Sequence, residues 1–299
     1  WDPETGTSHN TSSNQRSIRA SWFESLDTSV APARRADGSI DMHGLLLLNA
    51  RGRRAMNAGA QGAAWGQPEA EKATFWVVGD STVSAFNDSY YLPRVGYGEE
   101  LDNYFNANVY NLAVSGASSK DFASMDSYQV LLNGSKDVPA LGDAEGAKFL
   151  FIGFGHNDEK TEDARYTDPN GDYKTEGSFA HSLYTRYIQP ALERGVTPVV
   201  CTPMVRLTND NTAESYEGAS GHVTADTTIG QRTFAGGDYA QAIRDMCQEL
   251  SLICVDLTDA TLHENLTQGR NAQWMHSFTG AKLTPDGQLT ATGLDQTHT

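Results

Sequence analysis

A serine stands directly after an apolar run near residue 80. The run FWVV (75–78) leads into Gly79-Asp80-Ser81, and Thr82-Val83 follow. A serine hydroxyl is a poor nucleophile until a base removes its proton and a third group orients that base. Gly-Asp-Ser is also ordinary turn chemistry, and alone it favours that interpretation. Ser81 is therefore a candidate nucleophile only if its partners occur elsewhere in the chain.

Three further polar segments contain residue types that could serve as those partners. They are NLAVSGASS (111–119), GHND (155–158) and DQTHT (295–299). Each has an ordinary structural explanation when taken alone. Asn157-Asp158 could cap a helix, and Asp295 and His298 lie in a polar tail of the kind that frays.

Regular elements begin at residue 74 and would position these segments. Apolar, β-rich runs alternate with amphipathic stretches such as 178–195 and 238–250, the first of which ends at Gly195 as a helix with a glycine cap would. The β-rich runs are TFWVVG (74–79), NVYNLAV (108–114), KFLFIGFG (148–155), TPVVCTP (197–203) and LICVDL (252–257). Strands that are apolar on both faces and alternate with helices predict a parallel sheet covered on both sides. Ligands bind beyond the carboxyl ends of such strands, where Ser81 would lie.

Composition describes an ordinary globular chain of 299 residues, with 38% hydrophobic and 20% charged residues. The net charge of −16 argues against nucleic acid and anionic membranes as partners. No run approaches the roughly 18 apolar residues of a membrane span. Cys201, Cys247 and Cys254 show no metal-ligand spacing, and we expect free thiols on core elements. No metal is expected.

The four polar segments, in this order and at strand ends, resemble the GDSL or SGNH hydrolases over residues 74–299. The resemblance implies a three-layer α/β/α, flavodoxin-like sandwich with a central parallel five-stranded sheet and no cofactor. It implies Ser81 as nucleophile, His298 as base and Asp295 as the residue that orients the base. The backbone N–H groups of Ser81 and Gly116 and the amide of Asn157 would form the oxyanion hole, where a glycine lets the backbone approach a ligand closely.

Within this superfamily the chain looks like the rhamnogalacturonan acetylesterase branch. The similarity lies in GDSTV, GYGEEL (96–101), NLAVSGASSKDF (111–122), FGHNDE (154–159), TPVVCTPMVR (197–206) and GGDYAQAIRD (236–245). That branch removes acetyl groups from pectic rhamnogalacturonan or other plant polysaccharides. The resemblance therefore predicts a secreted serine esterase whose partner is an acetylated polysaccharide or oligosaccharide. The oligomeric state is left open.

Two long polar loops on the predicted active-site side fit a carbohydrate cleft. They cover residues 160–177 and 205–237, and loops of this length are usually functional or mobile. Tyrosines can stack on sugar faces, and arginine can bind a uronate carboxylate. The candidate substrate-binding residues are His156, Arg206, Tyr166 and Tyr173, with Arg165 and Tyr216 on the same loops.

Residues 1–70 are polar and rich in small residues, and we expect an N-terminal extension or the remnant of an upstream domain. Residues 71–299 form the predicted hydrolase domain. Family members continue past the final histidine motif with a helix, whereas this sequence stops one residue after His298. A base on a frayed terminus would lose positioning.

Two alternatives stay open at this stage. The same residues could deacetylate xylan or small acetylated sugars. A protein of another class, a non-catalytic carbohydrate-binding module, would keep the cleft without a working base. Four Asn-x-Ser/Thr sequons, at Asn10, Asn87, Asn133 and Asn265, are compatible with secretion but are too common to establish it.

Overall fold

The computed structural model describes residues 72–86, 94–269, 272 and 295–298, together with the backbone of four two-residue strands between 278 and 294. The expected extension over residues 1–70 lies outside the described residues. None of the helices in the described part is long and apolar enough to cross a membrane.

Five parallel strands form the central sheet in the order β2-β1-β3-β4-β7. They are β1 (Ala73–Gly79), β2 (Ala107–Asn111), β3 (Lys148–Gly153), β4 (Thr197–Cys201) and β7 (Ile253–Val255). Each of the five predicted runs overlaps one of these strands; β1 and β2 begin one residue before their runs, and the other three strands lie within theirs. The order is that of the flavodoxin-like, doubly wound sheet. The fold class expected from the sequence is therefore confirmed.

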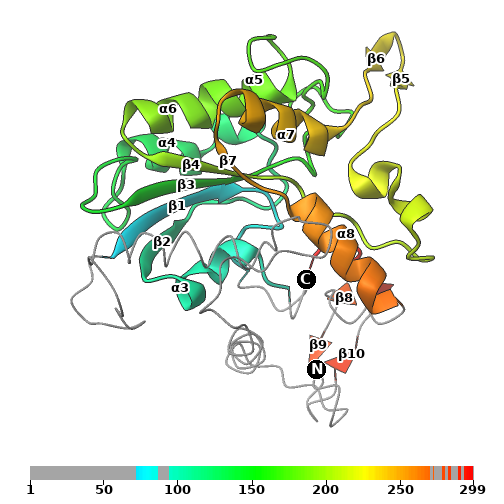
Figure 1. The fold of residues 1–299 in the computed structure, drawn as a ribbon, viewed down its shortest axis with the longest axis horizontal. Coiled ribbons are helices and arrows are strands. Elements are labelled where there is room, and N and C mark those ends of the chain that lie inside the picture. The colour runs from blue at the N-terminus through cyan, green and yellow to red at the C-terminus, as the bar shows by residue number, and fades with distance from the viewer. Residues whose placement is uncertain are drawn as a thin grey trace.

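Alternate residues of the sheet supply two separate hydrophobic cores. Trp76, Val78 and Leu150 pack on one face with the main helices, whereas Phe75 and Val77 pack on the other. Figure 1 shows α4, α5, α6 and α7 over the first face and α3 below the second. This burial on both faces explains why the strands read as nearly continuous apolar runs.

The described helices lie mostly between consecutive strands. They are α3 (Leu101–Tyr104), α4 (Asp126–Asn133), α5 (Phe179–Leu183), α6 (Gln189–Glu193), α7 (Tyr239–Glu249) and α8 (Leu257–Gln268), with short 3₁₀ turns at Tyr97–Glu99, Asp121–Ser124, Ala213–Tyr216 and Ala219–Gly221. A π-helical turn, Tyr184–Ile188, joins α5 to α6, so the predicted helix 178–195 is one continuous rod with a local change of winding. Gly195 follows it with φ +67°, as expected for a helix-ending glycine.

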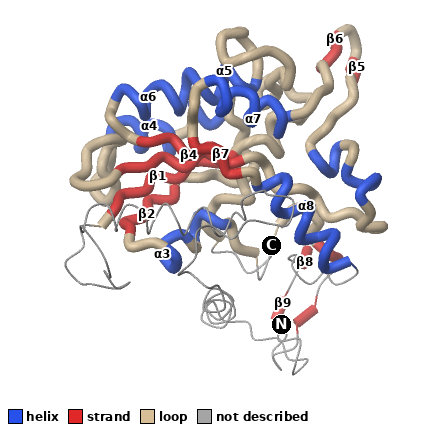
Figure 2. The backbone as a smooth tube through the Cα atoms, in the orientation of Figure 1, coloured by secondary structure: helices blue, strands red, loops and turns tan. Residues whose placement is uncertain are grey.

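Long connections follow β3 and β4 at the carboxyl edge of the sheet (Figure 2). The connection after β4 carries a projecting hairpin of β5 (Thr227–Ile229) and β6 (Arg232–Phe234). Two further antiparallel pairs join β8 (Phe278–Thr279) to β11 (Gly293–Leu294) and β9 (Lys282–Leu283) to β10 (Leu289–Thr290).

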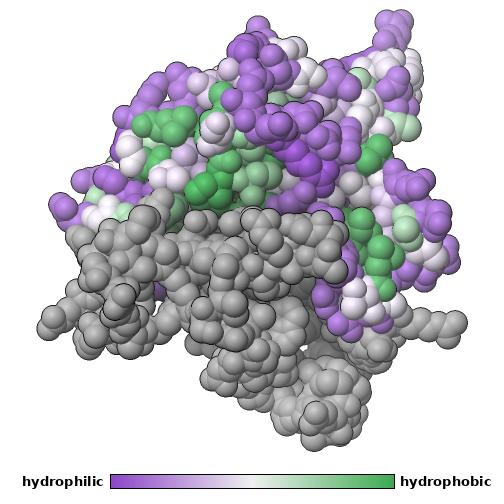
Figure 3. Space-filling model, in the orientation of Figure 1, coloured by the Kyte–Doolittle hydropathy of each residue, from purple (hydrophilic) through white to green (hydrophobic). Residues whose placement is uncertain are grey.

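Hydrophilic residues predominate over the helical layer in Figure 3. The three cysteines are free, and Cys201 and Cys247 are buried.

Candidate active site

Three strand ends bring the predicted site residues to one edge of the sheet. Ser81 follows β1, Gly116 follows β2 and Asn157 follows β3. The chain runs from β1 outward to β2 and then returns past β1 to β3. The crevice at this reversal is where doubly wound sheets bind ligands.

A chain of hydrogen bonds links Ser81 to His298 and Asp295. The Ser81 Oγ lies 2.7 Å from His298 Nε2, and His298 Nδ1 lies 2.7 Å from Asp295 Oδ2. The carboxylate can only accept, so Nδ1–H donates to Asp295 and Nε2 is left to accept the serine proton. The geometry can therefore transfer the hydroxyl proton of Ser81 to an oriented imidazole. Ser81 is 8% exposed.

Arg94 also binds the carboxylate of Asp295, and sequence reasoning missed it. Its Nη2 donates to Asp295 Oδ2 at 2.7 Å, and the guanidinium lies 4.7 Å from the centre of the Phe86 ring. Burial would raise the pKa of Asp295, but hydrogen bonds from His298 and Arg94 outweigh it and lower that pKa well below its usual range. The only sequence signal for Arg94 is its basic side chain, which gives no indication of a partner 201 positions away.

The segment from Asp295 to His298 is held by main-chain contacts as well. The N–H of Leu207, in the loop after β4, donates to the carbonyl of Gln296 at 2.8 Å. The N–H groups of Thr297 and His298 donate to Asp295 Oδ1 at 3.0 and 3.3 Å. His298 is thus positioned by bonds within its own turn and by a bond to a loop of the sheet edge.

Two backbone N–H groups at the strand ends are candidate oxyanion donors. Within the described residues, neither the N–H of Ser81 nor that of Gly116 has a hydrogen-bond acceptor. Gly116 has a φ of +86°, a conformation that favours glycine, and a Cβ built there would meet nothing within 4 Å. The Asn157 amide donates one hydrogen bond from Nδ2 to the Ala117 carbonyl at 3.0 Å, which leaves its second N–H available.

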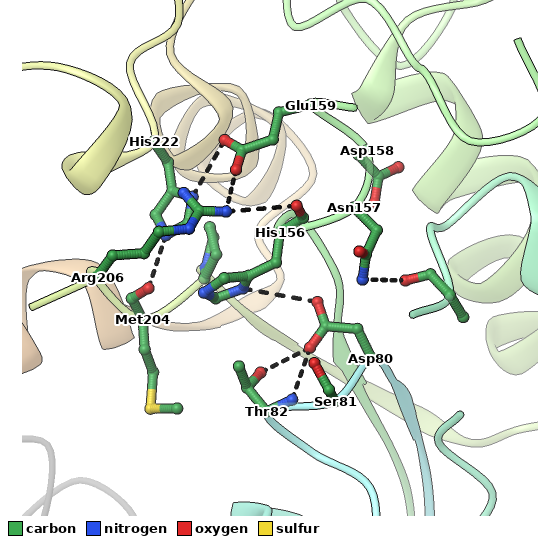
Figure 4. Close-up of polar contacts among 12 residues, drawn as sticks. Asp80, Ser81, Thr82, His156, Asn157, Asp158, Glu159, Met204, Arg206 and His222 are labelled. Carbon is green, nitrogen blue, oxygen red and sulfur yellow. Dashed lines mark hydrogen bonds and ion pairs between the residues drawn. The ribbon is translucent and has the colours of Figure 1, made fainter. Parts of the chain in front are cut away.

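A buried network of charged and imidazole groups lies next to Ser81 (Figure 4). Asp80 Oδ1 accepts hydrogen bonds from the backbone and hydroxyl of Thr82, and its Oδ2 lies 3.6 Å from His156 Nδ1. The rings of His156 and His222 meet edge to face with centroids 4.5 Å apart. His222 Nε2 donates to the Met204 carbonyl at 2.6 Å. This network fixes the turn on which the nucleophile stands.

The network continues to the loop after β4 through Glu159. Glu159 forms an ion pair with Arg206 and lies 3.4 Å from His222 Nδ1. Burial lowers the pKa of His156 to about 4, His222 adds to this shift, and Asp80 opposes it. Burial would raise the pKa of Asp80, but the nearby His156 ring and the hydrogen bonds from Thr82 lower it overall. His156 is therefore neutral in the folded protein above about pH 4.

Asp158, the residue after Asn157, is a second buried carboxyl group. Its Oδ1 accepts from the backbone and hydroxyl of Ser119 and from Thr167 Oγ1. The Ser119 hydroxyl also lies 2.7 Å from Ser182 Oγ on α5. Burial raises the pKa of Asp158 to about 7, against these hydrogen bonds. Asp158 thus ties the strand end that carries Asn157 to the helical layer.

The four residues suggested for substrate binding have contacts inside the protein. His156 is 3% exposed within the buried network, and Arg206 binds Glu159 and the Ala219 carbonyl. Tyr166 donates its hydroxyl to the Ala235 carbonyl, and Tyr173 packs against Tyr184. Their substrate contacts stay a prediction. Among the described residues no group of three or more His, Cys, Asp or Glu side chains could hold a metal ion.

Comparison with known proteins identifies the family. A profile of the GDSL-like lipase/acylhydrolase family matches residues 77–288. The chain belongs to this family. The stretch matched to the GDSL-like lipase/acylhydrolase family contains Ser81, Gly116 and Asn157 and ends before Asp295 and His298.

Individual relatives match different shares of the chain. The probable rhamnogalacturonan acetylesterase YesY of Bacillus subtilis (strain 168) is 33% identical over 139 residues, which are 46% of this chain and 56% of that protein. The chain thus spans little more than half the length of that relative. The solved structure of YXIM_BACsu from Bacillus subtilis has a TM-score of 0.49 and 18% identity over 76% of this chain and 51% of its own. A variant of the esterase AlinE4 has a TM-score of 0.33 and 13% identity over 64% of this chain and 79% of its own.

Proposed function

We propose that this protein is a serine esterase that removes O-acetyl groups from a plant cell-wall polysaccharide, and that this polysaccharide is rhamnogalacturonan. The observation that carries the proposal is the line of two 2.7 Å contacts from Ser81 through His298 to Asp295. Membership of a lipase/acylhydrolase family supports ester hydrolysis as the reaction.

In the proposed mechanism, Ser81 Oγ attacks the acetyl carbonyl carbon while its proton passes to His298 Nε2. The resulting imidazolium is stabilised by Asp295, which holds the Nδ1 proton. Collapse of the tetrahedral intermediate breaks the ester C–O bond, and the sugar oxygen takes the proton from Nε2. Water then gives a proton to Nε2 and attacks the acetyl-serine, and acetate leaves as Ser81 recovers its proton.

The tetrahedral intermediates carry a negative oxygen that needs donors already in place. The N–H groups of Ser81 and Gly116 and the free N–H of Asn157 are suited to this role, because the two backbone groups have no other acceptor among the described residues. Losing one such donor costs about a hundredfold to a thousandfold in turnover.

Several observations support an acetylated polysaccharide as the substrate. The relative YesY is named a probable rhamnogalacturonan acetylesterase. The connections after β3 and β4 are polar and line the site edge. A polymer of this kind does not cross a membrane, so an enzyme acting on it would work outside the cell. Of the sequon asparagines, Asn133 is exposed. Asn265 is only 2% exposed, and its side-chain amide donates to the Tyr216 hydroxyl. Asn265 therefore fits poorly with glycosylation of the folded protein.

The decisive experiment measures acetate release from an aryl acetate by the wild type and by Ser81→Ala. We expect activity to vanish in this variant. Ser84→Ala is the matched control, because Ser84 lies on the same turn, is buried, and has no partner for its hydroxyl within the described residues. A folded wild type that binds oligosaccharide without Ser81-dependent turnover would instead support the non-catalytic binding module.

A panel of acetylated rhamnogalacturonan, acetylated xylan and cephalosporin-type esters then separates the substrates. We expect the highest kcat/KM on the pectic polymer. Preference for xylan or small acetyl sugars would favour the alternative esterase with the same residues.

A further inference from the structure

Arg165 connects two strand ends of the site. Its Nη1 donates to the Gly116 carbonyl and to Asn157 Oδ1, each at 3.3 Å. Gly116 follows β2 and Asn157 follows β3, while Arg165 belongs to the loop after β3. One nitrogen therefore joins the two residues that would supply two of the three oxyanion donors.

The other two nitrogens of the Arg165 guanidinium bind Glu162. Arg165 Nε donates to Glu162 Oε2 at 2.9 Å, and Nη2 donates to Glu162 Oε1 at 2.6 Å. This two-pronged contact fixes the plane of the guanidinium, so that Nη1 points inward. Lys120 donates to the carbonyls of Asp163 and Tyr166, which fastens the same loop to the segment after Gly116.

The contacts of Asn157 determine which way its amide faces. Arg165 can only donate a hydrogen bond, and the Ala117 carbonyl can only accept one. Both are satisfied only when Oδ1 of Asn157 faces Arg165 and Nδ2 faces Ala117. A flipped amide would place two donors together and two acceptors together. Arg165 thus helps to keep the N–H₂ group on the side where an oxyanion donor is needed.

We propose that Arg165 is a positioning residue of the oxyanion hole, which fixes the amide of Asn157 and its spacing from Gly116. The inference rests on the proposed function, since it takes these two residues as oxyanion donors. It differs from the sequence-based suggestion that arginines on this loop bind a uronate carboxylate, because the guanidinium of Arg165 is already engaged on both sides.

The test compares Arg165→Ala and Arg165→Lys with the wild type on p-nitrophenyl acetate, which has no carboxylate. We expect kcat to fall about tenfold in Arg165→Ala, less than the hundredfold or more that loss of a donor costs, with KM changed less than about twofold. Lys cannot hold Glu162 and bridge both acceptors at once, so Arg165→Lys should recover little activity. Arg194→Ala, at the far end of α6, is the control and should match the wild type.

A double-mutant cycle with Asn157→Ala gives the second readout. If Arg165 acts through the amide of Asn157, Arg165→Ala should cost much less in the Asn157→Ala background than in the wild type. Thermal unfolding confirms that each variant is folded. Equal losses in both backgrounds, or an effect on KM confined to acetylated uronate oligosaccharides, would overturn the positioning role.

The failures of the two proposals are distinguishable in the same data set. Full activity of Ser81→Ala would refute the proposed function. Loss of activity in Ser81→Ala and Asn157→Ala, with normal kcat in Arg165→Ala, would refute only the role of Arg165.

Discussion

The carboxylate of Asp295 accepts hydrogen bonds on both of its oxygens. Arg94 and His298 converge on Oδ2, and the N–H groups of Thr297 and His298 reach Oδ1. Each of these donors favours the ionised form. Asp295 is therefore well suited to stabilise a positive imidazole while remaining an acceptor itself.

At the residue scale, we predict that Asp295→Asn lowers kcat on an aryl acetate by about 10⁴-fold, as the same change does in a serine-protease triad. The amide can present N–H₂ to Nδ1, which favours the tautomer with the proton on Nε2 and removes the acceptor for the Ser81 proton. Asp245→Asn, on the exposed side of α7, is the matched control. Retention of a tenth or more of the wild-type kcat would show that Asp295 does not orient His298.

At the scale of elements, the end of β1 fits closely against β3. A Cβ built on Gly79 would lie 2.4 Å from the Gly153 carbonyl oxygen and 2.5 Å from Val83 Cγ2. The absence of a side chain at Gly79 therefore sets how closely the strand carrying Ser81 approaches the strand that leads to Asn157.

We predict that Gly79→Ala destabilises the fold by about 1–3 kcal/mol through overpacking, measured by urea unfolding. It should also lower kcat in the fraction that remains folded, because Ser81 moves relative to Asn157. Gly218→Ala is the control, since a Cβ there meets nothing within 4 Å and its φ is not positive. Wild-type stability for Gly79→Ala would show that the strand ends can separate without cost.

The sequence predicts the sheet because its strands are apolar on both faces, and it predicts the residues at the strand ends because parallel strands end at one edge. Ser81, Gly116 and Asn157 follow from this rule together with the family resemblance. Arg94 could not be predicted, because its partner lies 201 positions away on no regular element. The contact of His156 with His222 likewise depends on how the loop after β4 meets the segment that follows β3, which local periodicity does not encode.

At the scale of the whole molecule, the pKa shifts of two buried groups have opposite effects on how stability changes between about pH 4 and 6.5. The folded pKa of His156 is lowered to about 4, so the unfolded state binds more protons in this window and stability rises with pH. The folded pKa of Asp158 is raised to about 7, so the folded state holds the extra proton and stability falls with pH. Asp80 interacts with both groups. The two contributions largely cancel in the wild type.

We therefore predict that Asp158→Asn reveals the contribution of His156. Relative to the wild type, its unfolding free energy should rise with pH by up to about 1.4 kcal/mol per unit between pH 4 and 6.5. His156→Gln should show the opposite slope relative to the wild type. Urea unfolding at half-unit pH intervals measures both. Parallel pH profiles for all three proteins would contradict the assignment of these two groups.

The hydrogen bond between Ser81 and His298 joins residues that are 217 positions apart. At roughly 5–20 residues per second, a ribosome would synthesise Ser81 some 10–40 s before His298. A nascent chain holding only the five strands would have the sheet and the serine but no means of activating it. Appearance of esterase activity would then mark the docking of the segment Asp295–His298, so turnover would time that step of folding.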